Sequence, residues 1–218
     1  MARLSETVEL LGELIAFQTI SDRSNIDMIA YIGHLLEQAG ARVDIFPDET
    51  GHKANLFATI GPEVDGGIVL SGHSDVVPVA DQDWTSDPFE MIEKDGNLVG
   101  RGACDMKGFI AAAVAMAPEF AARVGERPIH FAFTHDEETG CFGARGLVDS
   151  LRSKGIRPGV AIIGEPTSMR IIEGHKGCYE YSTHFTGLAG HGSSPDRGVN
   201  AVEYAARYVN RLLDLKDA

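Results

Sequence analysis

The sequence is poor in cysteine, in positive charge and in long apolar runs. Its three cysteines, Cys104, Cys141 and Cys178, form no C-x-x-C pair. An odd number without such pairs argues against a disulfide framework and for a reducing compartment. Lysine and arginine number 19 against 32 aspartates and glutamates, a formal net charge of −13. This charge argues against unspecific attraction to nucleic acid or to an anionic membrane.

No apolar run reaches the roughly 18 residues that a membrane-spanning helix needs. The N-terminal stretch MARLSETVELLGELIAF is interrupted by Glu6, Glu9 and Glu13, so it lacks the continuous apolar core of a signal peptide. We therefore expect a cytoplasmic protein. The chain of 218 residues, 44% of them hydrophobic, suffices for one domain with a core, or for one domain plus part of another.

Helix-like and strand-like segments alternate through most of the chain. Amphipathic or alanine-rich patterns predict helices over residues 4–17, 26–39, 105–122 and 144–154. Short apolar or alternating runs predict strands over residues 41–46, 55–61, 68–70, 128–134 and 159–164. Residues 80–100 are polar and predict a loop with a hairpin. The alternation predicts an α/β fold whose sheet is covered by helices on both faces.

The pattern changes after about residue 176. Residues 179–186 alternate like one strand, a glycine-rich loop follows, and residues 200–213 predict one helix with Tyr204 and Tyr208 on its apolar stripe. One strand and one helix bury too little surface to form a domain. We therefore expect this part to be the beginning of a second domain.

Chemically active side chains follow three of the predicted strands. His73 and Asp75 follow the strand at 68–70, Glu137 and Glu138 follow the strand at 128–134, and Glu165 follows the strand at 159–164. In open α/β sheets, sites form at the carboxyl ends of strands. These side chains are therefore predicted to meet at one sheet edge.

Each of these residues alone also has an ordinary structural interpretation. A histidine after a strand can be a satisfied core residue, the acids of THDEETG can occupy a solvated turn, and Asp105 can cap the helix it precedes. Asp136 has no predicted role beyond such a solvated position. Convergence changes the balance, because several carboxylates at one edge repel one another unless metal ions neutralise them.

Histidine and carboxylates without cysteine form a ligand set that suits Zn²⁺ or Co²⁺ in a hydrolytic site. With one shared aspartate, the set can hold two ions about 3.5–4 Å apart. Residues two apart on a strand face the same way, so Asp75 can orient the His73 ring. Glu137 and Glu138 face different ways, so one can bind metal while the other acts as general base.

Six motifs, in this order, resemble those of the dinuclear-zinc M20 aminoacylase and peptidase family. They are SGHSDVVP, GRGACDMKG, THDEETG, IIGEPTS, GHKG and GHGSSPDRGVNA. Within the family they are most similar to the acetylornithine deacetylases, with succinyl-diaminopimelate desuccinylase as the alternative. The resemblance implies a mixed sheet of the zinc-peptidase type, with the start of an inserted α+β lid that mediates dimerisation.

The resemblance also implies a role for each site residue. The implied ligands of two zinc ions, with cobalt as an alternative metal, are His73, Asp105, Glu138 and Glu165, with Asp105 bridging. Asp75 would orient His73, and Glu137 would be the general base. The implied reaction removes the acetyl group from N-acetyl-L-ornithine, a step in arginine biosynthesis. The peptide bond between Asp105 and Met106 is implied to be cis.

His191, in the glycine-rich loop, is either an ordinary surface residue or the family's lid histidine. In the second case it would reach the active site of the partner in a homodimer and stabilise the oxyanion. The resemblance assigns residues 1–177 to a catalytic domain lacking its C-terminal return, and residues 178–218 to the beginning of the lid.

The absent return would carry a last zinc ligand, a histidine. We therefore expect the 218-residue chain alone to be weakly active or inactive. Two other hypotheses stay open: a truncated, non-catalytic fragment that binds metal, and an α/β binding protein whose acids are solvated.

Overall fold

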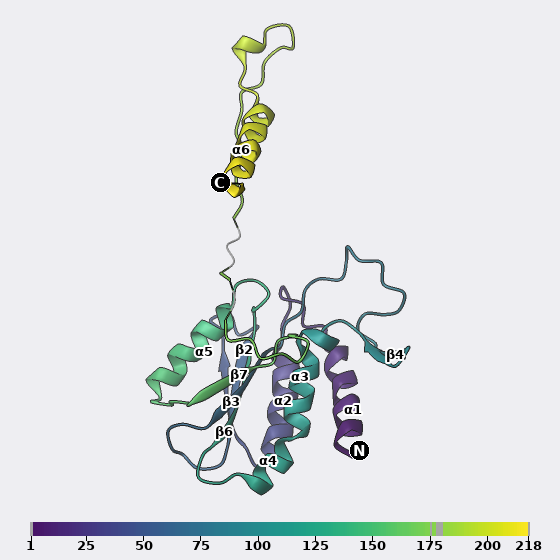
Figure 1. The fold of residues 1–218 in the computed structure, drawn as a ribbon, viewed down its shortest axis with the longest axis vertical. Coiled ribbons are helices and arrows are strands. Elements are labelled where there is room, and N and C mark those ends of the chain that lie inside the picture. The colour runs from purple at the N-terminus through teal and green to yellow at the C-terminus, as the bar shows by residue number, and fades with distance from the viewer. Residues whose placement is uncertain (1, 175, 178–180, 218) are drawn as a thin grey trace. The chain divides into compact units, whose positions relative to one another are not determined.

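The computed structural model describes residues 2–174, 176–177 and 181–217 and divides the chain into two compact units, Met1–Ile171 and Ile172–Ala218. The first unit is built on a five-stranded sheet with the strand order β1-β2-β6-β3-β7 (Figure 1). The strands are β1 (Arg42–Pro47), β2 (Ala54–Ile60), β3 (Ile68–His73), β6 (Ile129–Thr134) and β7 (Val160–Ile163).

The sheet is mixed, as the family resemblance implied. Strand β2 runs antiparallel to both β1 and β6, whereas β6, β3 and β7 are parallel neighbours. Parallel strands bring their carboxyl ends to the same edge, so β6, β3 and β7 deliver whatever follows them to one place. Strand β7 lies at the edge of the sheet, and its Val160 and Ile163 are exposed.

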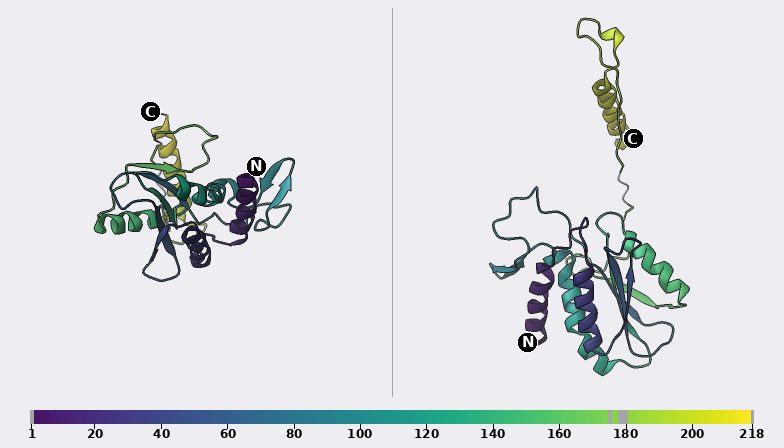
Figure 2. Two further views of the ribbon diagram at one scale, coloured as in Figure 1. Left: turned by 90° about the horizontal axis from the view of Figure 1, so that it is seen from below. Right: turned by 180° about the vertical axis from the view of Figure 1, so that it is seen from behind.

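Helices lie on both sides of this sheet (Figures 1 and 2). One side carries α1 (Ala2–Ala16), α2 (Ile26–Gln38), α3 (Gly108–Ala115) and α4 (Ala117–Arg123). The other side carries α5 (Phe142–Ser153). Alternation along the strands divides the side chains between the two faces. Phe131 and Phe133 join the larger core with α1 to α3, while Phe57 and Ala132 pack with Leu147 of α5.

The helix predicted over residues 105–122 is present in part, because it begins only at Gly108 and is interrupted at Met116. The chain instead forms a π-type turn over Ala103–Lys107 and then two helices, α3 and α4. Asp105 has φ −121° and ψ 96°, which is not helical, and it does not cap α3, because the residue at the N-cap position of that helix is Lys107. The break between α3 and α4 precedes Pro118, which lies in the first turn of α4, where its missing N–H costs no hydrogen bond.

The predicted hairpin within residues 80–100 is present as β4 (Ile92–Lys94) and β5 (Asn97–Val99). Its two-residue turn has φ 53° at Asp95 and 73° at Gly96, and such positive angles suit a tight hairpin. Among the described residues, no helix combines the length and the apolar character that crossing a bilayer requires.

The second unit holds α6 (Ala201–Lys216), preceded by a loop that the bridge between Leu188 and Val199 closes. Asn200 caps α6 by accepting hydrogen bonds from two N–H groups of its first turn. Within the described residues 181–186 no strand forms, and residues 179 and 180 lie outside the described part. Tyr208 nevertheless packs on Phe185, with ring centroids 5.5 Å apart.

Two glycines of α5 give a matched test of how tightly this helix packs. A Cβ on Gly143 would lie 2.3 Å from the carbonyl oxygen of His135, whereas one on Gly146 would meet nothing within 4 Å. We expect Gly143→Ala to lower the free energy of unfolding by about 2 kcal/mol through overpacking. Gly146→Ala should raise it by roughly 0.5–1 kcal/mol, as expected for an exposed helix position. Urea denaturation measures both, and equal effects would contradict the packing described.

Candidate metal centre

His73 lies at the centre of a cluster at the carboxyl ends of the three parallel strands. It is the last residue of β3 and pairs in register with Thr134, the last residue of β6. On its other side, the N–H of Gly164 donates to the carbonyl of Ser71, which fixes the chain as it leaves β7 toward Glu165. Sheet register therefore determines where the loops with Glu137, Glu138 and Glu165 begin.

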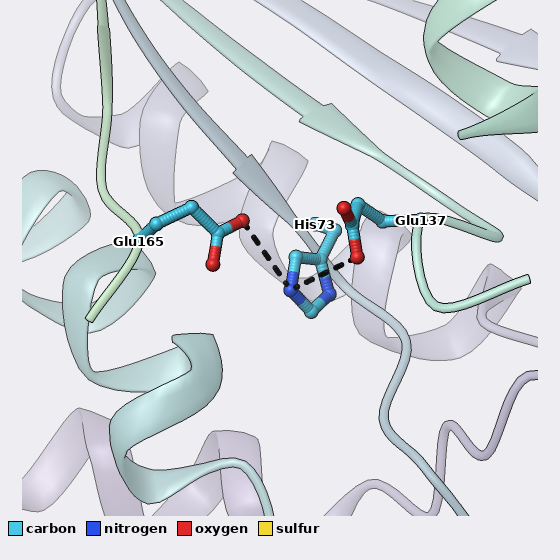
Figure 3. A group of neighbouring side chains, drawn as sticks. All are labelled: His73, Glu137 and Glu165. Atoms are coloured by element: carbon cyan, nitrogen blue, oxygen red, sulfur yellow. Dashed lines mark ion pairs between the residues drawn. The ribbon is translucent and has the colours of Figure 1, made fainter. Parts of the chain in front are cut away.

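The His73 side chain is buried, and three carboxylates approach its Nε2 atom. The distances are 3.0 Å to Asp105 Oδ1, 3.8 Å to Glu165 Oε1 and 3.9 Å to Glu137 Oε2. Figure 3 shows Glu137 and Glu165 reaching the ring from opposite sides. The predicted convergence of His73, Glu137 and Glu165 is thus present in the structure.

The other ring nitrogen, Nδ1, faces Asp75, the residue predicted to orient the ring. It donates to the backbone carbonyl of Asp75 at 2.9 Å, while the nearest carboxylate oxygen is 3.6 Å away. The carbonyl can only accept, so it fixes the proton on Nδ1. Nε2 is therefore the ring nitrogen that faces the carboxylates, and in the neutral ring its lone pair is free to bind a metal ion.

The Asp75 carboxylate itself organises the loop that bears the glutamates. It accepts hydrogen bonds from Ser21 Oγ at 2.7 Å, from the Glu137 N–H at 3.1 Å and from the Glu138 N–H at 3.3 Å. Burial alone would raise the pKa of Asp75, but these donors and the adjacent His73 hold it below its usual value. Asp75 therefore joins the ends of β3 and β6 as a charged acceptor.

Electrostatics shows that the cluster is short of positive charge. Burial raises the pKa of both Glu138 and Glu165, and the neighbouring Asp105 and Glu137 raise it further. Burial would lower the pKa of His73, yet Asp75 and Asp105 raise it to about 9. These shifts reflect negative charge gathered around His73, which a bound cation would help to neutralise.

The donors fit a metal ion in chemistry and in spacing. Two groups have ligand atoms that all lie within 4.8 Å of one another: His73, Asp105 and Glu138, and His73, Glu137 and Glu165. Ligands about 2.0–2.1 Å from a tetrahedral zinc ion are roughly 3.3 Å apart. The separations of 3.0 to 3.9 Å around Nε2 bracket that value.

The loop that carries Asp105 is anchored by a residue to which the sequence assigned no role. Lys107 is fully buried, and its ammonium group donates to the carbonyls of Leu14 at 2.9 Å and Phe17 at 2.7 Å, near the end of α1. Burial lowers the pKa of Lys107 to about 7. The sequence signal that could have indicated its burial is its place directly before the apolar helix α3. The peptide bond between Asp105 and Met106 is cis, as the resemblance implied.

His191 lies in the second unit and is exposed. Its Nδ1 atom accepts the backbone N–H of Ser193 at 3.2 Å and lies 2.8 Å from the Ser193 hydroxyl. With Nδ1 as acceptor, the neutral ring carries its proton on Nε2. The ring is thus prepared as a hydrogen-bond donor.

Comparison with known proteins identifies the lineage of these motifs. Residues 69–212 match the profile of peptidase family M20/M25/M40. The chain belongs to this family. The match begins inside β3 and extends into α6, so it includes every residue of the cluster around His73.

The M20 chain has relatives of similar sequence and of similar structure. It is 40% identical to an acetylornithine deacetylase from Proteus mirabilis, over 99% of this chain and 56% of that protein. It is 26% identical to human carnosine dipeptidase 1, with a TM-score of 0.63 over 74% of this chain and 38% of that one. An M20 metallo-carboxypeptidase from Sulfolobus solfataricus, 20% identical over 73% of this chain and 37% of that one, shares the fold with a TM-score of 0.64. The chain thus spans little more than half the length of the curated relative.

Removing the negative charge of Asp75 tests how the M20 chain holds the cluster together. Asp75→Asn replaces one acceptor oxygen by an amide that repels the N–H groups directed at it. We expect the metal-free protein to lose about 3 kcal/mol of unfolding free energy, the cost of breaking a buried charged network. Asp44→Asn, at an exposed pair with Lys154, is the control and should cost under about 1 kcal/mol. Equal losses of unfolding free energy for Asp75→Asn and Asp44→Asn in urea titrations would show that Asp75 does not hold the strand ends together.

Proposed function

We propose that this chain is part of a metal-dependent amidohydrolase that removes the acetyl group from N-acetyl-L-ornithine. The observation that carries the proposal is the buried His73 ring with Asp105, Glu137 and Glu165 around one nitrogen. Membership of the M20 family and likeness to acetylornithine deacetylases support the reaction class. Succinyl-diaminopimelate desuccinylase activity is the nearest alternative within the same chemistry.

His73, Asp105, Glu138 and Glu165 would hold the metal, zinc or cobalt. One imidazole nitrogen binds one ion, so a second ion would rest on carboxylates, with Asp105 as the shared ligand. The raised pKa values of Glu138 and Glu165 support this division, because a cation would relieve the repulsion among these acids. When bound, the metal polarises the scissile carbonyl and makes water a stronger nucleophile at neutral pH.

Glu137 is the proposed general base. Its side chain is 39% exposed, so water reaches it, and its carboxylate lies 3.9 Å from the centre of the cluster at His73 Nε2. In this role it takes a proton from the attacking water and returns it to the leaving amine. The competing role, a metal ligand together with His73 and Glu165, uses the same carboxylate. Loss of metal on substitution would identify that second role.

Residues 1–177 are proposed as catalytic domain and residues 178–218 as the beginning of a lid that mediates a homodimer. The exposed His191, with its proton on Nε2, is then available to donate to the oxyanion of a partner's substrate. The hydrogen bond from the Ser193 N–H to His191 Nδ1 supports the donor role of Nε2. The proposal of a partner protomer rests on the family resemblance.

Substitution of Glu137 tests the reaction and separates its two roles. The zinc-loaded chain should release acetate from N-acetyl-L-ornithine faster than it releases succinate from N-succinyl-diaminopimelate, although slowly in absolute terms. Glu137→Gln should reduce turnover by roughly 10²- to 10⁴-fold, the usual contribution of a general base. Its zinc content, measured by atomic absorption, should not change. Glu126→Gln, at an exposed position, is the matched control and should alter neither quantity.

Two outcomes would contradict parts of this account. Zinc lost from Glu137→Gln would make Glu137 a ligand. Faster release of succinate would reassign the substrate. Tight zinc binding without turnover on any N-acyl amino acid would favour the other hypothesis, a fragment that binds metal but does not catalyse by itself.

A further inference from the structure

The first acid of the D-E-E run, Asp136, is not at a solvated turn position, which corrects the expectation from sequence. Its side chain is only 16% exposed and forms an ion pair with the ammonium group of Lys53, which is 17% exposed. His135 Nδ1 donates to its second carboxylate oxygen at 3.0 Å. Asp136 is thus held on both oxygens, directly before the two glutamates of the candidate site.

Lys53 connects this pair to the support of the metal centre. Besides Asp136, its ammonium group donates to the backbone carbonyl of Ser21. The hydroxyl of that same serine donates to the Asp75 carboxylate at 2.7 Å. Asp75 in turn receives the N–H groups of Glu137 and Glu138. The contacts therefore close a circuit that starts and ends in the D-E-E turn.

The backbone of Asp136 shows what this circuit holds in place. Its φ of 55° lies in the left-handed region, which costs a non-glycine residue about 1 kcal/mol or more. After this residue, two successive N–H groups converge on one carboxylate, the arrangement of an anion-binding backbone nest. Such a conformation persists only where the surroundings fix it.

We propose that the Lys53–Asp136 ion pair is a latch that sets the direction of Glu137 and Glu138 toward the metal centre. Lys53 and Asp136 are positioning residues: they touch neither metal nor substrate, and they act through the turn between β6 and α5. The proposal rests on the proposed metal site. It adds that two residues outside the ligand set determine how the glutamates are placed there.

Burial distinguishes this pair from the other lysine–aspartate pair of the first unit. Lys154 and Asp44 are 43% and 48% exposed, so water screens their attraction. The Lys53–Asp136 pair is shielded, and the Lys53 ammonium group also donates to the backbone carbonyl of Ser21, so the pair connects the turn to a second segment of the chain. The chain thus provides its own matched control.

Cobalt titration of the 218-residue chain tests the latch. We expect Lys53→Met to weaken Co²⁺ binding by roughly 10- to 100-fold, the usual effect of losing an outer partner of a metal site. The visible absorption spectrum of the bound Co²⁺ should also change, because the turn presents its carboxylates differently. Lys53→Arg, which keeps the charge and the donors, should restore most of the affinity. Lys154→Met should stay within about twofold of the unmodified chain.

Asp136→Asn provides a second variant that keeps the shape of the side chain and removes its charge. If the two residues act as one latch, the double variant with Lys53→Met should bind Co²⁺ no more weakly than the worse single variant. Additive losses would mean that the residues act separately and would overturn the proposal.

Two further outcomes separate this proposal from its foundation. An unmodified chain that binds no Co²⁺ would overturn the proposed metal site and the latch with it. Normal Co²⁺ affinity and spectrum in Lys53→Met, with only a lowered melting temperature, would overturn the latch alone and leave the metal site intact. The latter result would assign the pair to stability of the fold.

Discussion

The repulsion among carboxylates at one sheet edge is the constraint on which the rest of the site depends. Glu138 and Glu165 have raised pKa values because burial and neighbouring acids disfavour their charge, and His73 has a pKa of about 9 because acids surround it. Such a cluster is costly without a cation. The fold therefore has to hold the acids in place, and the hydrogen bonds of Asp75 and Lys107 oppose their separation.

Two sets of contacts hold the cluster in place. Hydrogen bonds within the sheet determine where β3, β6 and β7 end, and Asp75 then fastens the end of β3 to the turn after β6. On the far side, Lys107 fastens the loop with Asp105 to the end of α1. In both cases an ionisable side chain forms hydrogen bonds with backbone atoms: Asp75 accepts from N–H groups, and Lys107 donates to carbonyl groups. These bonds fix loops that lie outside the regular hydrogen bonding of helices and strands.

Much of this arrangement could be predicted from the sequence, because periodicity and strand-end position are local signals. The α/β sheet and the meeting of His73 with Glu137 and Glu165 follow from apolar runs and from the parallel-strand rule, and the family resemblance implied that the sheet is mixed. What the sequence analysis missed depends on tertiary contacts. The ammonium group of Lys53, 83 positions away in the chain, pairs with Asp136, and that of Lys107 bonds to carbonyls near the end of α1. Neither contact leaves a pattern in the surrounding residues.

Anomalous X-ray diffraction at the zinc edge, on crystals of the chain grown with Zn²⁺, tests the central claim most directly. The account predicts an anomalous peak about 2.0–2.1 Å from His73 Nε2, with carboxylate oxygens of Asp105 or of the neighbouring glutamates in the same shell. Zinc bound elsewhere, or a peak whose ligands exclude His73, would contradict it.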